Sequence, residues 1–326
     1  MINKKYLVTG LILLFFLFLF YLVPGPSRTI LVQVREGDTF HKVARTLKKE
    51  GMVRSELFFI GLAKLTGSSG KLKTGTYEIS SRSGSWNIIR ILTGSKTASK
   101  IFTIPEGYNT FQIAGLLEQR GITSRTAFLN AVKSRKILDH FKIDQMTAEG
   151  FLYPETYYIP YEYTAEDIVM LMMKSFFSRI TPVYIKKIKE KYGSLEKGVN
   201  LASLVEWEAK ADFERPIIAG VFLNRLNQNL NLGSCATVLY ALNRHKERLL
   251  FKDLKINSPY NTYVYQGLPP TPICNPSEKS ILAVIYPARD TYLYFVSMNN
   301  GRHYFSTTYG EHLQAYRYYI LGERVQ

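Results

Sequence analysis

The sequence predicts an α+β protein in three parts: an N-terminal membrane helix, a region of short strand–helix units, and a mixed α/β domain. Three observations support this prediction. Residues 6–23 are apolar and uncharged, a strand–turn–helix pattern occurs twice with a constant offset of 70 residues, and a strong hairpin signal lies near the C-terminus. At 326 residues the chain exceeds one typical domain. We place the boundaries after residues 26 and 145, which gives segments 1–26, 27–145 and 146–326.

The first segment has the composition of a membrane anchor. Lys4 and Lys5 precede the apolar stretch from Tyr6 to Val23, and Pro24 follows it. The eighteen residues of this stretch would rise about 27 Å as a helix, close to the roughly 30 Å hydrocarbon core of a bilayer. The lysines favour a cytoplasmic N-terminus, which would place the rest of the chain on the outer side of the cell (inner) membrane. A cleaved signal peptide is the alternative, although no small-x-small cleavage site is seen.

The second segment contains an internal repeat. Each copy reads as a short strand, a turn at Glu-Gly, a helix with an apolar stripe, and a stop at Gly. Repeated strand–helix units outside a membrane suggest a binding module used twice, and chance similarity of two short elements is the alternative. The matching positions are Val34–Gly37 with Ile104–Gly107, Val43 with Ile113, Leu47 with Leu117, and Gly51 with Gly121.

Composition narrows the classes of ligand. The net charge is +16, but Lys and Arg are scattered without a basic run, so we expect no nucleic-acid partner. The aromatic content of 13% is mostly Tyr and Phe, and Tyr-rich clefts suit sugars because the ring stacks while the hydroxyl makes hydrogen bonds. The two cysteines, Cys235 and Cys274, could form a disulfide or remain two buried thiols. Neither they nor the five histidines show zinc-site spacing, so we expect no metal and no cofactor.

One predicted helix, residues 201–209, places a carboxyl group among apolar residues. Glu208 shares a face with apolar side chains at helical spacing, whereas Glu206 lies roughly 200° around the axis and points away from the core. Desolvation raises the pKa of a carboxyl on an apolar face, and this gives the protonated state that a general acid needs. Pairing with an Arg is the alternative. The apolar residues of that face are Leu201, Leu204 and Val205.

Further elements follow in the same region. Ala165 to Lys191 looks mainly helical, and Glu214 to Leu226 predicts another helix. The stretch 258–276 holds five prolines and three tyrosines, which is typical either of a functional loop of defined shape or of a rigid connector. Asn299-Asn300-Gly301 lies between two strand-like runs and predicts a hairpin. A closing helix is expected from Glu311 to Leu321.

Seven segments carry a resemblance along nearly the whole chain. They are Glu149–Tyr157, Leu201–Ala209, Val221–Leu226, Ala236–Tyr240, Ser258–Tyr263, Gly267–Pro270 and Tyr292–Val296. In order and spacing they resemble the MltG (YceG-like) family of membrane-anchored endolytic murein transglycosylases. Many members carry Asp-Pro before Thr-Val where this chain has Cys235-Ala236, which puts in doubt an acid role at that position.

The resemblance implies a defined reaction. The family cleaves the β-1,4 bond between N-acetylmuramic acid and N-acetylglucosamine inside glycan strands, leaves a 1,6-anhydromuramic end, and uses no water. Its catalytic carboxyl group is the second Glu of a Glu-x-Glu motif, which falls on Glu208. The family's N-terminal region resembles LysM modules, so segment 27–145 is expected to bind the wall and 146–326 to catalyse. The implied partners are peptidoglycan strands, with membrane-bound peptidoglycan synthases as an open second class.

One essential acid suffices for this chemistry. Glycoside hydrolysis uses two carboxyl groups, but in a transglycosylase the muramic C6 hydroxyl attacks within its own sugar, so that proximity replaces the second group. Glu155 is preferred over Asp212 and Glu214 as a further carboxylate in the site. The other candidate substrate contacts are Asn224, Tyr260 and Asn261, of which Asn224 and Tyr260 have an equally good structural interpretation.

Two other functions remain open at this point. The first is a non-enzymatic, membrane-anchored wall-binding protein that uses the repeat and keeps the C-terminal region as a scaffold. The second is a two-carboxylate muramidase, whose products would carry oxygen from water. The intact motif around Glu208 favours the transglycosylase.

Overall fold

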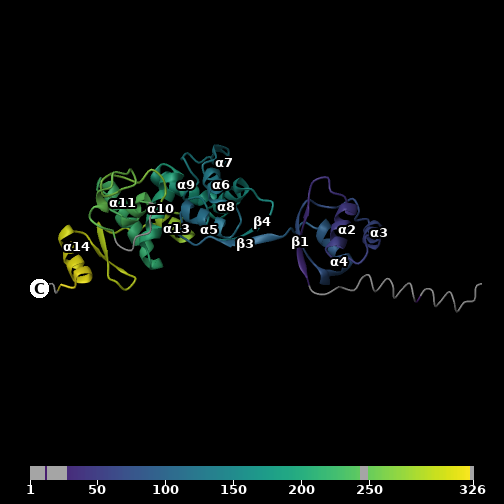
Figure 1. Ribbon diagram of the computed structural model, residues 1–326. Coiled ribbons are helices and arrows are strands. Elements are labelled where there is room, and N and C mark those ends of the chain that lie inside the picture. Colours follow the sequence, from purple (N-terminus) through teal and green to yellow (C-terminus); the bar gives the residue numbers. More distant parts are fainter. Residues whose placement is uncertain (1–11, 13–27, 243–248, 324–326) are drawn as a thin grey trace, which may run out of the picture. The chain divides into compact units, whose positions relative to one another are not determined.

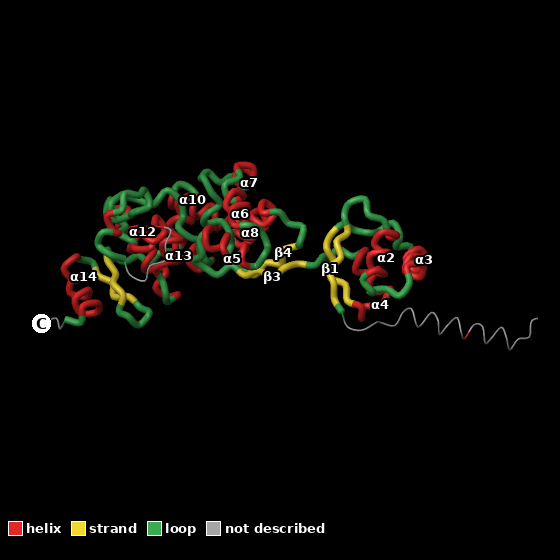
Figure 2. Tube along the Cα trace, viewed as in Figure 1, coloured by secondary structure: helices red, strands yellow, loops and turns green. Residues whose placement is uncertain are grey.

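The computed structural model describes residue 12, residues 28–242 and residues 249–323, and the chain divides into two compact units. The N-terminal unit comprises Met1–Ile101 and Tyr158–Tyr163, and the C-terminal unit comprises Phe102–Tyr157 and Thr164–Gln326. The described residues form three two-stranded sheets among many helices (Figure 2). This agrees with the predicted α+β class. The predicted membrane helix, residues 6–23, lies outside the described residues apart from one position.

The N-terminal unit is built on an antiparallel strand pair covered by helices. Strands β1 (Thr29–Val34) and β2 (Gly75–Ser80) pair with Val32 opposite Tyr77. Between them lie α2 (Phe40–Lys49) and α3 (Glu56–Leu65), and after them α4 (Gly84–Thr93). Tyr77 is fully buried in the core, and its hydroxyl donates to the carbonyl of Lys73 at 3.0 Å. The unit therefore has its own apolar core and satisfies its largest buried polar side chain.

The strand–turn–helix pattern occurs in both predicted copies. In the first copy, β1 leads through Gly37 (φ +81°) into α2. In the second copy, β3 (Ser99–Thr103) leads through Gly107 (φ +75°) into α5 (Thr110–Gln119). Each helix is capped by a side chain, Thr39 in the first and Asn109 in the second. The two segments are therefore similar in local structure as well as in sequence.

The two copies nevertheless fall in different compact units, whose division differs from the boundary expected after residue 145. The division lies at residues 101 and 102, within the paired strands β3 and β4 (Thr156–Pro160). The physical reason is the carboxylate of Glu149, which is fully buried and accepts hydrogen bonds from Thr110 N at 3.0 Å, Tyr240 OH at 3.2 Å and Asn275 Nδ2 at 3.1 Å. Residues 102–145 thus belong to the core of the C-terminal unit.

Asn275 completes this buried junction. Its Oδ1 accepts the backbone N–H groups of Gly150 at 2.9 Å and Leu152 at 2.8 Å. Gly150 has a φ of +90°, and a Cβ built there would lie 2.5 Å from Cγ of Pro272. Only glycine fits both the backbone conformation and this close approach. Burial raises the pKa of Glu149 to about 7, although the hydrogen bonds from Thr110, Tyr240 and Asn275 act in the opposite direction.

The C-terminal unit is mainly helical and centres on α10 (Leu195–Glu208). This helix packs against α9 (Pro182–Tyr192), α11 (Arg215–Asn227), α12 (Cys235–Leu242) and α13 (Glu278–Ile285) (Figures 1 and 2). The predicted helix at 165–191 is broken at Pro182 into two. The predicted hairpin and the helix at 214–226 are confirmed. The closing helix begins two residues early and ends in a π-helical turn, Arg317–Leu321. The remaining helices and strands are α6 (Arg125–Ala131), α7 (Arg135–His140), α8 (Ala165–Arg179), β5 (Tyr294–Ser297), β6 (His303–Ser306) and α14 (Tyr309–Tyr316).

Polar residues of α10 form hydrogen bonds with the proline-rich segment 269–277, which runs along the helix. Asn200 Nδ2 donates to the carbonyl of Pro269 at 2.6 Å, and Ser203 Oγ accepts from Ile273 N at 3.0 Å. One helical turn later, Glu206 accepts from Ser277 N at 2.8 Å. The segment 269–277 is therefore a packed connection along α10, which agrees with the rigid-connector interpretation of this part of the stretch 258–276.

Among the described residues, no single helix combines the length and the apolarity needed to cross a membrane. Helices α8 and α9 meet the criteria only when they are taken together, and they are bent by 85° at their junction. Both helices also bury side chains within the C-terminal unit, such as Met172 and Ile188.

The junction at Glu149 yields a stability prediction. We expect Glu149→Gln to lower the free energy of unfolding by about 2 kcal/mol or more, because the new amide nitrogen would face donors that now bind a carboxylate. Chemical denaturation followed by circular dichroism measures this change. Glu190→Gln on the exposed side of α9 is the matched control and should stay within about 0.5 kcal/mol of the parent. Equal stability of the two variants would mean that the junction does not hold the unit together.

Candidate active site

The C-terminal unit contains a pocket of about 520 Å³ that holds Glu208. The residues that line it come from the end of α10, the second half of α11, the turn before α12, the β5–β6 hairpin, and α14. These elements are far apart in the sequence and are brought together by packing around α10 and α11. The lining mixes aromatic side chains with a few polar and charged groups, as is typical of small-molecule and sugar sites.

Glu208 is the last residue of α10, and its partly exposed side chain reaches this pocket. The hydroxyl of Ser234 donates to its Oε1 at 2.5 Å. Burial raises the pKa of Glu208, although the Ser234 hydrogen bond and the nearby His303 lower it in part. The apolar face predicted beside it is real, since Leu201, Leu204 and Val205 are fully buried. The environment therefore favours the protonated form of this carboxylic acid, which is the form that a general acid needs.

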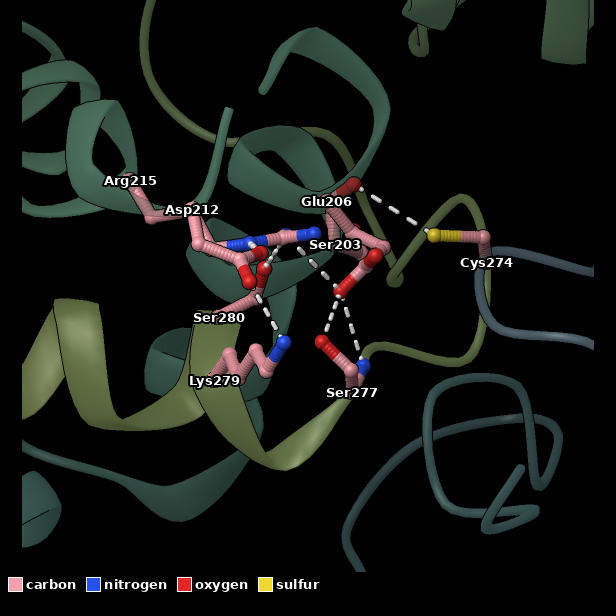
Figure 3. Close-up of polar contacts among 8 residues, drawn as sticks. All are labelled: Ser203, Glu206, Asp212, Arg215, Cys274, Ser277, Lys279 and Ser280. Atoms are coloured by element: carbon pink, nitrogen blue, oxygen red, sulfur yellow. Dashed lines mark hydrogen bonds and ion pairs between the residues drawn. The ribbon is translucent and has the colours of Figure 1, made fainter. Parts of the chain in front are cut away.

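Glu206 does not point away from the core, so that expectation is wrong. Helix α10 has no exposed face in its second half, because other helices surround it. The side chain of Glu206 is only 5% exposed, and its carboxylate lies 3.2 Å from a guanidinium nitrogen of Arg215 (Figure 3). Ser277 also donates to it through both its backbone N–H and its hydroxyl. A buried carboxylate needs such a partner, because an unpaired charge would be costly in this environment.

The Arg215 guanidinium connects this pair to the surface. Its Nε donates to Asp212 at 3.1 Å, and another of its nitrogens donates to the hydroxyl of Ser280. Lys279 in turn pairs with Asp212 (Figure 3). Asp212 is therefore engaged in an ion-pair network at the start of α11 and does not line the pocket.

The pocket wall also carries a cation and an aromatic stack. Arg225 donates from Nε to the carbonyl of Asn231 at 2.8 Å and from a terminal nitrogen to that of Leu293 at 2.7 Å. Its guanidinium lies 5.1 Å from the centre of the Tyr294 ring, which stacks on His312 at 5.3 Å. Such a wall offers ring faces to sugars and a positive charge to an acidic substituent.

His303, on β6, lines the same pocket and pairs with Glu214 behind it. Its Nδ1 lies 2.8 Å from one carboxylate oxygen of Glu214, and its backbone N–H donates to the other oxygen at 2.9 Å. Glu214 is only 2% exposed. Glu214, which the sequence favours less than Glu155 as a second carboxylate, thus contacts the pocket indirectly, by pairing with His303.

The four substrate contacts predicted beside Glu208 do not line this pocket. Glu155 instead pairs with Arg179 at 3.4 Å and accepts a hydrogen bond from Ser175 on α8. Asn224 donates to the carbonyls of Asp290 at 2.9 Å and Tyr292 at 3.0 Å, which ties α11 to the segment before the hairpin. Both side chains therefore have structural partners.

The remaining two predicted contacts stabilise the loop that contains them. The hydroxyl of Tyr260 lies 2.8 Å from that of Thr271. Asn261 is fully buried, and its Nδ2 donates to the carbonyls of Leu254 at 3.0 Å and Ile256 at 2.9 Å. Of the five predicted site residues, the structure places only Glu208 in the pocket.

Sequence reasoning missed most of the other pocket residues. Arg225 stands next to Asn224 in a segment that carries the resemblance, so the sequence contains a signal for this region. His303 and Glu214 are 89 residues apart and carry no local signal of their pairing. Both cysteines are free thiols: Cys235 lines the pocket with its sulfur 3.1 Å from the hydroxyl of Tyr263, and Cys274 is buried. No group of three or more potential metal ligands occurs among the described residues.

Comparison with known proteins shows which family the chain belongs to. The model of the YceG-like family matches residues 32–318. The chain is 33% identical over 313 residues to an endolytic murein transglycosylase of Bacillus subtilis (strain 168), with 90% of this chain and 86% of that protein covered. It is 29% identical to the endolytic murein transglycosylase of Streptococcus pneumoniae serotype 2 (strain D39 / NCTC 7466), covering 88% of this chain and 57% of the longer pneumococcal protein.

A solved structure is also similar. The crystal structure of a putative yceG-like protein from Listeria monocytogenes matches with a TM-score of 0.61 and 30% identity, over 88% of this chain and 98% of that one. The fold, the family match over most of the chain, and the sequence similarity to these relatives agree. The chain therefore belongs to the YceG-like family.

Proposed function

We propose that this protein is an endolytic murein transglycosylase in which Glu208 is the catalytic acid. Its membership of the YceG-like family and its similarity to relatives with that name support the activity. The observation that carries the residue assignment is Glu208 itself, a carboxyl group with a raised pKa at the end of a buried helix and in the wall of a large pocket. The substrate is the glycan strand of peptidoglycan.

The reaction needs one proton to be delivered to a glycosidic oxygen. Glu208, whose protonated form is favoured because burial raises its pKa, donates this proton to the oxygen that links muramic acid to the next glucosamine. The C6 hydroxyl of the same muramic residue attacks its own anomeric carbon, which closes the 1,6-anhydro ring and releases the glucosamine end. In the simplest scheme, the Glu208 carboxylate then accepts the proton that the C6 hydroxyl loses. Because the nucleophile belongs to the same sugar, no second carboxylate has to activate water.

Location and wall binding follow as further parts of this proposal. The apolar stretch 6–23 would anchor the chain in the cell membrane with the N-terminus in the cytoplasm. The N-terminal unit, with its β1–α2–α3–β2 order, would serve as a LysM-like module that binds glycan. Residues 102–145 would support catalysis, since they pack within the C-terminal unit. Peptidoglycan synthases in the membrane remain a proposed second class of partner.

The catalytic assignment predicts the behaviour of Glu208→Gln. We expect this variant of the full-length protein to lose at least about 10²-fold in turnover on intact sacculi, because an amide cannot donate the required proton. Liquid chromatography with mass spectrometry of anhydromuropeptides measures the loss. Glu190→Gln should match the parent, since Glu190 lies on the exposed surface of α9. A folded Glu208→Gln protein with near-normal activity would contradict the assignment.

The origin of the new chain end separates the transglycosylase from a two-carboxylate muramidase. Digestion in water enriched in heavy oxygen should give 1,6-anhydro ends without the heavy isotope. Incorporation of that isotope into reducing ends would favour the muramidase. Binding to sacculi without any cleavage would favour the non-enzymatic wall-binding protein.

The raised pKa of Glu208 also predicts the alkaline limit of activity. A general acid works only while it is protonated, so the rate should fall as the pH rises through the pKa of Glu208. Because burial raises that pKa, we expect the fall to occur above 4.5, the ordinary value for glutamate. Initial rates on uncrosslinked glycan strands across a pH series test this prediction, and a fall centred at or below 4.5 would contradict it.

A further inference from the structure

A buried carboxylate holds the ring of His303 in a fixed orientation at the pocket. One oxygen of Glu214 faces Nδ1 of His303 at 2.8 Å, and the other oxygen accepts the backbone N–H of the same residue at 2.9 Å. The side chains of the two residues are only 3% and 9% exposed. Phe295 packs edge-on against the imidazole with ring centres 5.3 Å apart. Rotation of the ring would break these contacts, so both its position and its plane are set by the fold.

The pairing also fixes which ring nitrogen can accept a proton. A carboxylate accepts hydrogen bonds, so the Nδ1 that faces Glu214 carries the hydrogen, and the lone pair of the uncharged ring lies on Nε2. Within the described part of the chain, Nε2 of His303 makes no hydrogen bond, and the residue lines the pocket that holds Glu208. The arrangement is a base oriented by a third group, next to a carboxylic acid.

We infer that His303, oriented by Glu214, accepts the proton of the muramic C6 hydroxyl while Glu208 acts only as the acid. This inference rests on the proposed function and divides its two proton transfers between two residues. As Glu208 donates its proton to the leaving oxygen, the C1–O bond breaks and the C6 oxygen bonds to C1. The C6 hydroxyl proton passes to Nε2 of His303. The proton then returns from His303 to Glu208, which restores both groups.

The charges around His303 suit this division. Glu214 stabilises the imidazolium that forms during the step, and the new carboxylate of Glu208 faces the same pocket. Other charged or titratable groups that line the pocket are Arg225 on α11 and His312 on α14, together with Cys235, Tyr263, Tyr294, Tyr309 and Tyr316. His312 is a weaker candidate base, because burial and the nearby Arg225 lower its pKa and its Nδ1 is buried without a partner among the described residues.

Removal and chemical replacement of the imidazole test the inference on full-length protein in detergent. We expect His303→Ala to lower kcat on uncrosslinked glycan strands by ~10²-fold with little change in KM, and free imidazole to restore about tenfold of this loss. Glu208→Gln should not respond to imidazole. His140→Ala, which removes an exposed histidine on α7, should keep the parent's activity with or without imidazole. Thermal unfolding of each variant reports whether the fold is retained.

The pH profile gives a second readout that does not depend on the alanine variant being folded. If His303 is the base, the parent should also lose activity on the acid side. His303→Gln should lose that acid-side limb along with most of its turnover, whereas Glu214→Gln should lose turnover but keep an acid-side limb, because the imidazole remains. If Glu208 performs both transfers, only the alkaline limb exists in all of them. A parent without an acid limb, or a folded His303→Ala protein with normal turnover or with no response to imidazole, overturns the inference. A parent that yields no anhydro ends at all would instead overturn the proposed function.

Discussion

The buried ion pair between Glu206 and Arg215 is the constraint on which the geometry of the pocket depends. Glu206 lies two residues before the end of α10, and Arg215 is the first residue of α11. The pair therefore closes the short turn between these helices from both sides. Because both side chains are at most 8% exposed, loss of either partner would leave a buried charge, which typically costs about 3–5 kcal/mol. Residues close to the pair along the chain serve the pocket: Glu208 lies two positions after Glu206, and Glu214 directly precedes Arg215.

Three glutamates within nine positions thus have three different environments, and their roles follow from their neighbours. Glu206 has a guanidinium partner and holds the backbone. Glu214 has an imidazole partner and orients a ring. Among the described residues, Glu208 accepts a hydrogen bond from the hydroxyl of Ser234, and burial raises its pKa. Identical side chains thus differ in partner and in proposed role because desolvation and pairing differ from one position to the next.

The sequence was sufficient for features that depend on neighbours along the chain. The apolar stripe beside Glu208, the hairpin at Asn299–Gly301 and both strand–turn–helix segments depend on local spacing, and the structure contains them all. Features that depend on distant partners could not be predicted. Glu149 binds groups 39, 91 and 126 residues away, and these bonds place the second strand–turn–helix segment in the C-terminal unit.

The same limit explains the errors at the site. Glu206 was expected to point outward because a single helix gives no information about what packs on its other side. The chemistry of four other side chains suited substrate binding: Glu155, Asn224, Tyr260 and Asn261. Each of them instead makes a contact within the fold, and its partner is either far away along the chain or in an irregular loop. Such contacts leave no periodic pattern in the sequence. Side-chain chemistry narrowed the choice of residues, and only the fold could show which of them reach the pocket.

The division of the chain into units has a consequence for how this protein could have evolved. Residues 158–163 belong to the N-terminal unit, although the residues on both sides of them along the chain belong to the C-terminal unit. A recombination event that exchanged only the first 101 residues would separate the rest of the N-terminal unit from this short excursion. The two units are therefore expected to have been inherited together, and exchange of the N-terminal unit as a single cassette would require compensating changes around residue 160.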